Sequence, residues 1–126
     1  MSTRLARRYV PLSGNYTVLP PRDSAGTIFT NRDATGAITI TLPTPTRALL
    51  GYQYLFKGVV DQSVTVQVPT ASTLVALNGT TFTSIAFSTA GQKIGAQIEV
   101  TCIETAAGTF RWAALGDAVG HTYTVA

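Results

Sequence analysis

The chain has 126 residues and a formal net charge of +3, and its charged side chains make up 12% of the sequence, against about 25% in an average soluble domain. This length suits one domain with a hydrophobic core and is too short for two. The single cysteine excludes an internal disulfide and a cysteine-based metal cluster. No apolar stretch approaches the roughly 18 residues needed to span a bilayer, so we expect no membrane association, and no secretory signal is expected either.

Residues 1–14 predict a basic, extended N-terminal arm. The first 50 residues carry six arginines and two aspartates, a balance of +4, whereas three basic and four acidic residues leave the remaining 76 at −1. Pro11 and Gly14 interrupt regular structure in this stretch. A nucleic-acid-binding protein usually spreads a longer basic stripe with interleaved aromatic residues, so no nucleic-acid partner is expected. We expect the arm to bind acidic groups on a partner or a neighbouring subunit, through Arg4, Arg7, Arg8 and Tyr9.

Residues 15–126 predict a single β-domain because apolar residues fall on alternate positions. Ile38, Ile40 and Leu42 share one face of a strand, while threonine takes the other, and the chain contains 21 threonines. Threonine suits a half-exposed strand because its branched Cβ packs on the pleat while its hydroxyl faces water. The predicted strands cover about residues 15–19, 26–30, 37–42, 51–60, 63–68, 73–77, 83–88, 93–104, 109–115 and 121–125.

Glycine, proline and asparagine separate these strands and predict turns. Asn78-Gly79 suits a two-residue type I′ hairpin between Leu77 and Thr80. One helical turn fits residues 47–51, and no long amphipathic helix is visible. Short strands at this spacing predict an all-β fold: an antiparallel sandwich, or a jelly-roll-like or barrel-like domain, that carries the extended N-terminal arm.

Aromatic residues alternate in two of the predicted strands. Such residues most often anchor a core or a subunit interface, and a platform that stacks on carbohydrate is the alternative. Cys102 falls on the same face as Ile98 and Val100 and is expected to be a buried small hydrophobe. The predicted anchors are Tyr52, Tyr54, Phe56, Phe110 and Trp112.

The sequence predicts no enzyme. His121 is the only imidazole, and it lies in a run of alternating apolar and polar residues. The chain also lacks a nucleophile-elbow pattern. Glu99 and Glu104 are the only carboxylates on one short segment, and their odd spacing places them on opposite faces of a regular strand. No nucleotide-binding or calcium-binding motif occurs. We therefore expect no catalytic residues, no metal site and no cofactor.

The low charge also bears on assembly. A surface of Thr, Ser, Ala and Gly is weakly hydrated and carries little charge to repel a neighbour. This composition favours burial between subunits and a homo-oligomer over the alternative of a neutral monomer.

One stretch resembles a pattern found in small β-rich virion proteins of tailed bacteriophages. An aspartate and glycine turn, Asp23-Ser24-Ala25-Gly26, precedes Thr27-Ile28-Phe29-Thr30-Asn31, and Gly36 and Ile38-Thr39-Ile40-Thr41-Leu42-Pro43 follow. An aromatic strand comes next, here Tyr52-Gln53-Tyr54-Leu55-Phe56. Val100-Thr101-Cys102-Ile103 and Thr109-Phe110-Arg111-Trp112 are similar to the closing pair of strands. The similarity spans residues 16–113 loosely, and each of its motifs is short.

This resemblance implies a structural component of the virion with no enzymatic activity. The absence of heptads, collagen-like repeats and a long shaft favours a capsid decoration (cement) protein, which would be made in the host cytoplasm and lie on the capsid exterior. The implied partners are the major capsid protein and further copies of the chain, most simply as a homotrimer. A component of a tail fibre or tail tip and a carbohydrate-binding adhesion module are the alternatives.

Overall fold

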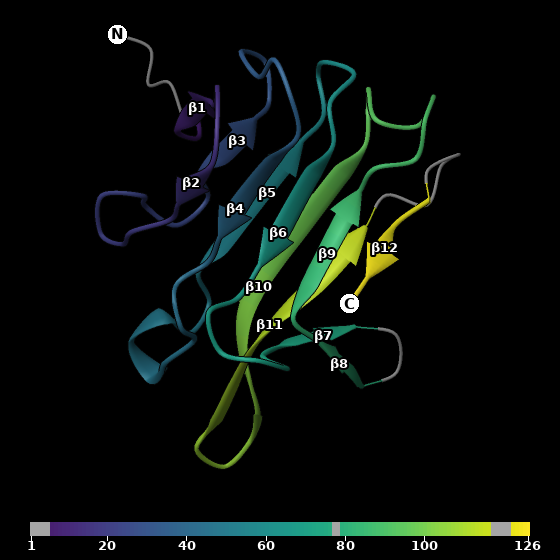
Figure 1. The fold of residues 1–126 in the computed structure, drawn as a ribbon. Helices are drawn as coiled ribbons and strands as arrows, with labels where there is room; N and C mark the ends of the chain where they lie inside the picture. Colours follow the sequence, from purple (N-terminus) through teal and green to yellow (C-terminus); the bar gives the residue numbers. More distant parts are fainter. Residues whose placement is uncertain (1–5, 77–78, 117–121) are drawn as a thin grey trace, which may run out of the picture.

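Two β-sheets pack face to face in the computed structural model, which describes residues 6–76, 79–116 and 122–126 (Figure 1). This arrangement confirms the all-β sandwich that the alternating sequence predicts. One 3₁₀ turn, η1 (Arg47–Leu49), lies between β4 and β5, within the segment where one helical turn was expected. In spatial order, the seven-stranded sheet contains β1 (Tyr9–Pro11), β3 (Ile28–Thr30), β5 (Gln53–Lys57), β10 (Gln97–Ala106), β11 (Thr109–Gly116), β7 (Leu74–Ala76) and β8 (Thr80–Phe82). The five-stranded sheet contains β12 (Thr124–Val125), β9 (Ser84–Phe87), β6 (Val64–Gln67), β4 (Ile38–Thr41) and β2 (Tyr16–Thr17).

Within this sandwich both sheets are mixed, with parallel as well as antiparallel pairs, whereas the sequence suggested antiparallel pairing. From β1 to β6 the chain alternates between the two sheets, so β1, β3 and β5 lie in one sheet and β2, β4 and β6 in the other. Two strands of one sheet that are separated by a strand of the other run in the same direction. The pairs β1–β3, β3–β5, β2–β4 and β4–β6 are accordingly parallel, as is β7–β11.

The core lies between the sheets and is built from the apolar side of each alternating strand. Ile38 and Ile40 of β4 are the register partners of Val64 and Val66 on the neighbouring strand β6 of the same sheet. All four side chains are buried. Trp112 of β11 is completely buried, and its Nε1–H donates a hydrogen bond to the Pro43 carbonyl (2.8 Å), which follows β4 in the other sheet. This bond joins the two sheets directly, in addition to the packing of the indole ring.

The N-terminal stretch is not a free arm from residue 9 onward. Residues 9–11 form β1, Ile28 N–H donates to the Arg8 carbonyl (2.8 Å), and Leu12 N–H donates to the Thr30 carbonyl (2.8 Å). Val10 and Leu12 are apolar at alternate positions, and Leu12 is buried in the core cluster. This short alternation pairs with β3, so the described domain begins earlier in the chain than the sequence suggested. Arg4 lies outside the described residues.

The predicted hairpin around Asn78-Gly79 is present, but its register differs. Ala76 pairs with Thr80 in the antiparallel β7–β8 pair, which leaves three residues between the paired positions instead of two. Gly79 has a φ of +86°, a conformation that glycine adopts readily. This register differs from the one that a two-residue turn between Leu77 and Thr80 requires, and residues 77 and 78, on which that prediction falls, lie outside the described part of the chain.

The role of Trp112 can be divided into ring packing and hydrogen bonding. Trp112→Ala leaves a large cavity and should lower the free energy of unfolding by about 3–5 kcal/mol. Trp112→Phe keeps an aromatic ring but leaves the Pro43 carbonyl without its donor, so a loss of about 1–3 kcal/mol is expected. Urea unfolding followed by circular dichroism measures both. A loss near zero in Trp112→Phe would contradict a separate contribution from the bond between the sheets, and equal losses in the two variants would contradict a contribution from ring packing.

Candidate functional site

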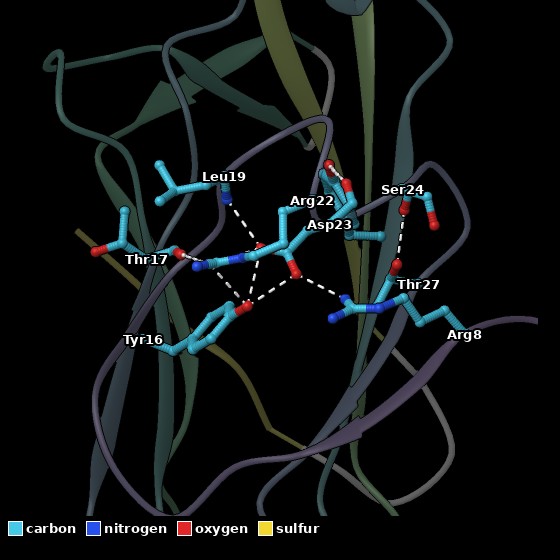
Figure 2. Close-up of polar contacts among 9 residues, drawn as sticks. Arg8, Tyr16, Thr17, Leu19, Arg22, Asp23, Ser24 and Thr27 are labelled. Carbon is cyan, nitrogen blue, oxygen red and sulfur yellow. Dashed lines mark hydrogen bonds and ion pairs between the residues drawn. The ribbon is translucent and has the colours of Figure 1, made fainter.

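A buried carboxylate organises the N-terminal end of the sandwich (Figure 2). The Asp23 side chain is completely buried, and Arg8, which precedes β1, contacts its Oδ1 through Nη1 at 2.7 Å. Arg22 contacts Oδ2 through Nη2 at 3.2 Å. The two guanidiniums remain partly exposed, with 38% and 53% of their side-chain surface accessible. Asp23 is thus a buried anion held between two cations at the surface.

Two further donors complete the coordination of Asp23. The Tyr16 hydroxyl lies 2.8 Å from Oδ1 and 2.9 Å from Oδ2, and Leu19 N–H donates to Oδ2 at 2.9 Å. A carboxylate offers about four lone-pair positions, and these four donors occupy them. Because no acceptor position is left for a substrate or a metal, the arrangement anchors the chain and does not form a general base.

The backbone of Asp23 is held as firmly as its side chain. The Tyr54 hydroxyl, from β5, donates to the Asp23 carbonyl (2.7 Å), and Asp23 N–H donates to the Leu19 carbonyl (3.0 Å). Arg22 Nη2 also donates to the Tyr16 hydroxyl (2.9 Å) and to the Thr17 carbonyl (3.1 Å), while its guanidinium lies 5.3 Å from the centre of the Tyr16 ring. We call Arg8, Tyr16, Leu19, Arg22 and Asp23 the Asp23 cluster.

Competing effects act on the pKa of the Asp23 carboxyl. Burial alone raises this pKa, but the hydrogen bonds from Leu19 N–H, from the Tyr16 hydroxyl and from the two guanidiniums together hold it below the ordinary value of 3.8. The same surroundings raise the pKa of the Tyr16 hydroxyl, through burial first and through the neighbouring Asp23 second. The cluster therefore contains a charged carboxylate and a protonated tyrosine at neutral pH.

Asn31 is a second buried polar residue with every major group in use. Its Oδ1 accepts hydrogen bonds from Val59 N–H (2.8 Å) and Val60 N–H (3.2 Å). Its Nδ2 donates to the carbonyls of Val60 (3.2 Å) and Gln62 (3.0 Å). The side chain is completely buried and substitutes for a strand in satisfying the backbone of the turn between β5 and β6. Asn31 thus supports the fold from the position directly after β3.

The predicted partner-binding residues are not equivalent in the structure. Arg8 is engaged with Asp23 of its own chain, whereas the sequence suggested an acidic partner for it. The Arg7 Nε–H donates to the Gly26 carbonyl (2.5 Å) from an exposed position. Tyr9 is 55% exposed on the edge strand β1. Arg7 and Tyr9 are accordingly exposed without an ion pair to Asp23, whereas Arg8, although 38% of its side-chain surface is accessible, is bonded to that carboxylate.

The predicted aromatic anchors separate into buried and half-buried residues. Tyr54, Phe56 and Trp112 are completely buried in the core. Tyr52 packs against the core from a half-buried position, and half-buried Phe110 carries the Arg47 guanidinium 5.3 Å above its ring. Cys102 is buried, and burial raises the pKa of its thiol. His121 lies outside the described residues.

The Asp23 cluster has no local signature in the sequence. Residues 20–23 read only as a turn, because proline and aspartate are ordinary turn residues. A sharper signal was the charged pair Arg22-Asp23, which lies close to Ile28 and Phe29 in a segment whose apolar residues indicate burial. A charge next to a buried segment indicates a partner of opposite charge. The partners Arg8 and Tyr16 lie 15 and 7 positions away, distances that no local pattern relates to Asp23.

Among the described residues, no three His, Cys, Asp or Glu side chains are grouped so that they could hold a metal ion. No helix in the same residues is long and apolar enough to cross a membrane. No protein-family model matches the chain, and no curated protein matches it.

The charge on Asp23 should make stability depend on acidity. A carboxyl whose pKa is depressed by folding stabilises the folded state above its unfolded pKa, and this contribution is lost as the pH falls through the folded value. Urea midpoints of the wild-type chain should therefore fall between about pH 5 and pH 2, and Asp23→Asn should flatten this dependence. At neutral pH the variant should be less stable by about 1–3 kcal/mol. Asp33→Asn, which removes an exposed aspartate, is the control and should retain the wild-type slope.

Adjacent arginines allow a matched comparison of the bonds within the chain. Arg8→Gln removes a charged donor to a buried carboxylate and should lower stability by about 1–2 kcal/mol. Arg7→Gln removes the same charge from an exposed position and should change stability by less than about 0.5 kcal/mol. Thermal or urea unfolding of the two variants measures the difference. Equal effects would contradict a special role for the bond between Arg8 and Asp23.

Proposed function

We propose that this chain is a non-enzymatic structural protein of a bacteriophage particle, and more specifically a capsid decoration protein. In this proposal it binds the outer surface of the major capsid protein, joins neighbouring capsomers and stabilises the head. It assembles with further copies of itself, most simply as a trimer on a threefold axis of the particle. It needs no cofactor and acts through binding alone.

The observation that carries this proposal is the location of the virion-protein pattern in the fold. The segment from Asp23 to Asn31 supplies the Asp23 anchor, strand β3 and the Asn31 bonds, and the segment that ends at Pro43 supplies β4 and the acceptor for Trp112. The residues of the pattern therefore determine the sandwich itself. A resemblance carried by fold-determining residues supports a shared architecture with those virion proteins more than chance similarity between threonine-rich strands would.

The use of polar groups supports a role without catalysis. Among the described buried polar residues, Asp23 and Asn31 are the completely buried ones with a charged or an amide side chain. The hydrogen-bonding groups of both side chains are bonded to other groups of the chain itself. Buried titratable groups in enzymes are usually poised toward an accessible space. In this chain, Asp23 and Asn31 instead hold loops and an edge strand in place, which suits a protein selected for a rigid shape.

The aromatic residues favour this proposal over carbohydrate binding. A sugar stacks on an exposed ring face, but Tyr54, Phe56 and Trp112 have essentially no accessible surface. Phe110 is half-buried and lies beneath the Arg47 guanidinium. The predicted platform residues are thus used for packing, which removes the main sequence argument for a glycan-binding module.

Quantitative proteomics of purified virions, with negative controls from uninfected lysate, tests the proposal. A decoration protein should be present in a fixed high ratio to the major capsid protein and should remain on particles whose tails have been removed. Recovery in a few copies with the tail fraction would instead indicate a fibre or tip component. Absence from both fractions would overturn a virion role altogether.

The oligomeric state gives a second test of the same proposal. Light scattering on the purified chain should give a trimer mass, and an interface of about 800 Å² or more per partner would be of standard size. A monomer mass at tens of micromolar would contradict assembly of the trimer before it binds the particle. Threefold density for the chain on particles would then be needed to support a trimer that forms only there.

A further inference from the structure

The outer face of the seven-stranded sheet carries an apolar row that the core does not use. The strand registers place Tyr9, Ile28, Leu55, Glu99 and Leu115 side by side across β1, β3, β5, β10 and β11. Leu115 is 67% exposed and Tyr9 is 55% exposed, while Leu55 between them is buried. An exposed sheet face usually presents polar residues to water. We call these five residues the outer row.

The five-stranded sheet has a different outer face. Its outward positions on β4 and β6 are Thr39, Thr41, Thr65 and Gln67, and Ala86 of β9 is the outward neighbour of Thr65. No charged residue and no large apolar residue stands among these positions. The outer row is exposed at its two ends, Tyr9 and Leu115, and exposed apolar residues on one face mark interaction surfaces, where tyrosine and arginine are enriched as binding hot spots. The seven-stranded sheet is therefore the face with the composition of a docking surface.

Charges around the outer row identify the kind of partner. On the same face, Lys57 lies two residues along β5 from Leu55 and Arg111 lies on β11, while Arg7 contacts Gly26 just before β3. Glu99 is the one carboxylate in the row, and the Gln53 side-chain amide donates to it at 2.6 Å. Three cations and one anion leave the face positive. A second copy that packed face to face would bring like charges together, whereas a surface rich in carboxylates would complement them.

The edge of this sheet disfavours docking by strand addition. The bonds from Ile28 N–H to the Arg8 carbonyl and from Leu12 N–H to the Thr30 carbonyl direct the even-numbered residues of the segment toward β3. Residues 9 and 11 therefore direct their backbone groups outward, and Pro11 has no N–H to donate there. A partner at this side is accordingly expected to contact side chains on the sheet face and not to extend the sheet.

We propose that the outer row, flanked by Arg7, Lys57 and Arg111, is the surface that docks this chain onto a partner protein surface that combines apolar side chains with carboxylates. This inference rests on the proposed function only for the identity of that partner, the major capsid protein. The apolar row supplies the desolvated centre of the contact, and the cations at its margin select for acidic groups and accelerate association.

A titration of the ¹⁵N-labelled full chain tests the surface without a virion. The probe is a short blocked peptide of alternating leucine and glutamate, and the matched control peptide alternates leucine and lysine. Saturable shift changes should occur at the amides of the outer row with the acidic peptide and be absent with the basic one. Leu115→Ala should weaken binding about fivefold, whereas Leu50→Ala, at an exposed leucine in the turn before β5, should leave it unchanged.

Charge is tested with a second matched pair. Lys57→Gln should weaken peptide binding and reduce its salt dependence, whereas Arg32→Gln, which removes the same charge from an exposed loop, should do neither. Shift changes confined to the five-stranded sheet, or their absence, would overturn the inference. Concentration-dependent shifts of the outer row without peptide would identify a second copy as the occupant and would also overturn it. The virion proteomics can fail independently, so the two proposals are distinguishable.

Discussion

The N-terminal third of the structure depends on the hydrogen bonds and ion pairs that the buried Asp23 carboxylate makes. Burying an ion is costly unless charged and hydrogen-bonding partners replace its water, and here four donors do so at once. Those donors come from the residue before β1, from β2 and from the turn after it. Tyr54 of β5 holds the carbonyl of the same residue. One carboxylate therefore connects strands of both sheets and holds a weak, three-residue edge strand in place.

The bonds to Asp23 also explain why the sequence and the structure differ most at the N-terminus. Arginines near a chain end, followed by proline and glycine, ordinarily indicate a solvated segment. Arg8 reads identically whether its carboxylate lies on a partner or 15 positions further along the chain. Only the fold determines which of these applies. Val10 and Leu12 offered a short alternating signal, but two apolar residues are too few to separate an edge strand from a tail.

Elsewhere the fold could be predicted from the sequence to the level of strands but not to the level of their order. Alternation locates a strand such as β4 or β6 because the side-chain period of two depends on local geometry alone. Whether the next strand joins the same sheet or the opposite one depends on where the turn directs the chain, and Pro43-Thr44-Pro45 permits either. The alternation between sheets from β1 to β6 converts what looks like a series of hairpins into parallel pairs. The same limit applies to Trp112, whose burial follows from its strand but whose bond to Pro43 spans 69 positions.

The two outer faces show how a chain with little charge divides its surface. In a sandwich, one side of each strand packs into the core, so only the outward-facing positions are free to vary with function. On the five-stranded sheet these positions carry hydroxyl, amide and methyl groups, which give a neutral surface with little tendency to attract any charged partner. On the seven-stranded sheet they carry leucine, isoleucine and tyrosine together with a small excess of positive charge. Exposed leucine costs solubility and contributes nothing to a core it does not face, so its presence on one face and absence from the other support the docking surface proposed above. The arginine that the sequence suggested for such a contact, Arg8, instead holds β1 in the sheet, and this places Tyr9 at the end of the row where a partner can reach it.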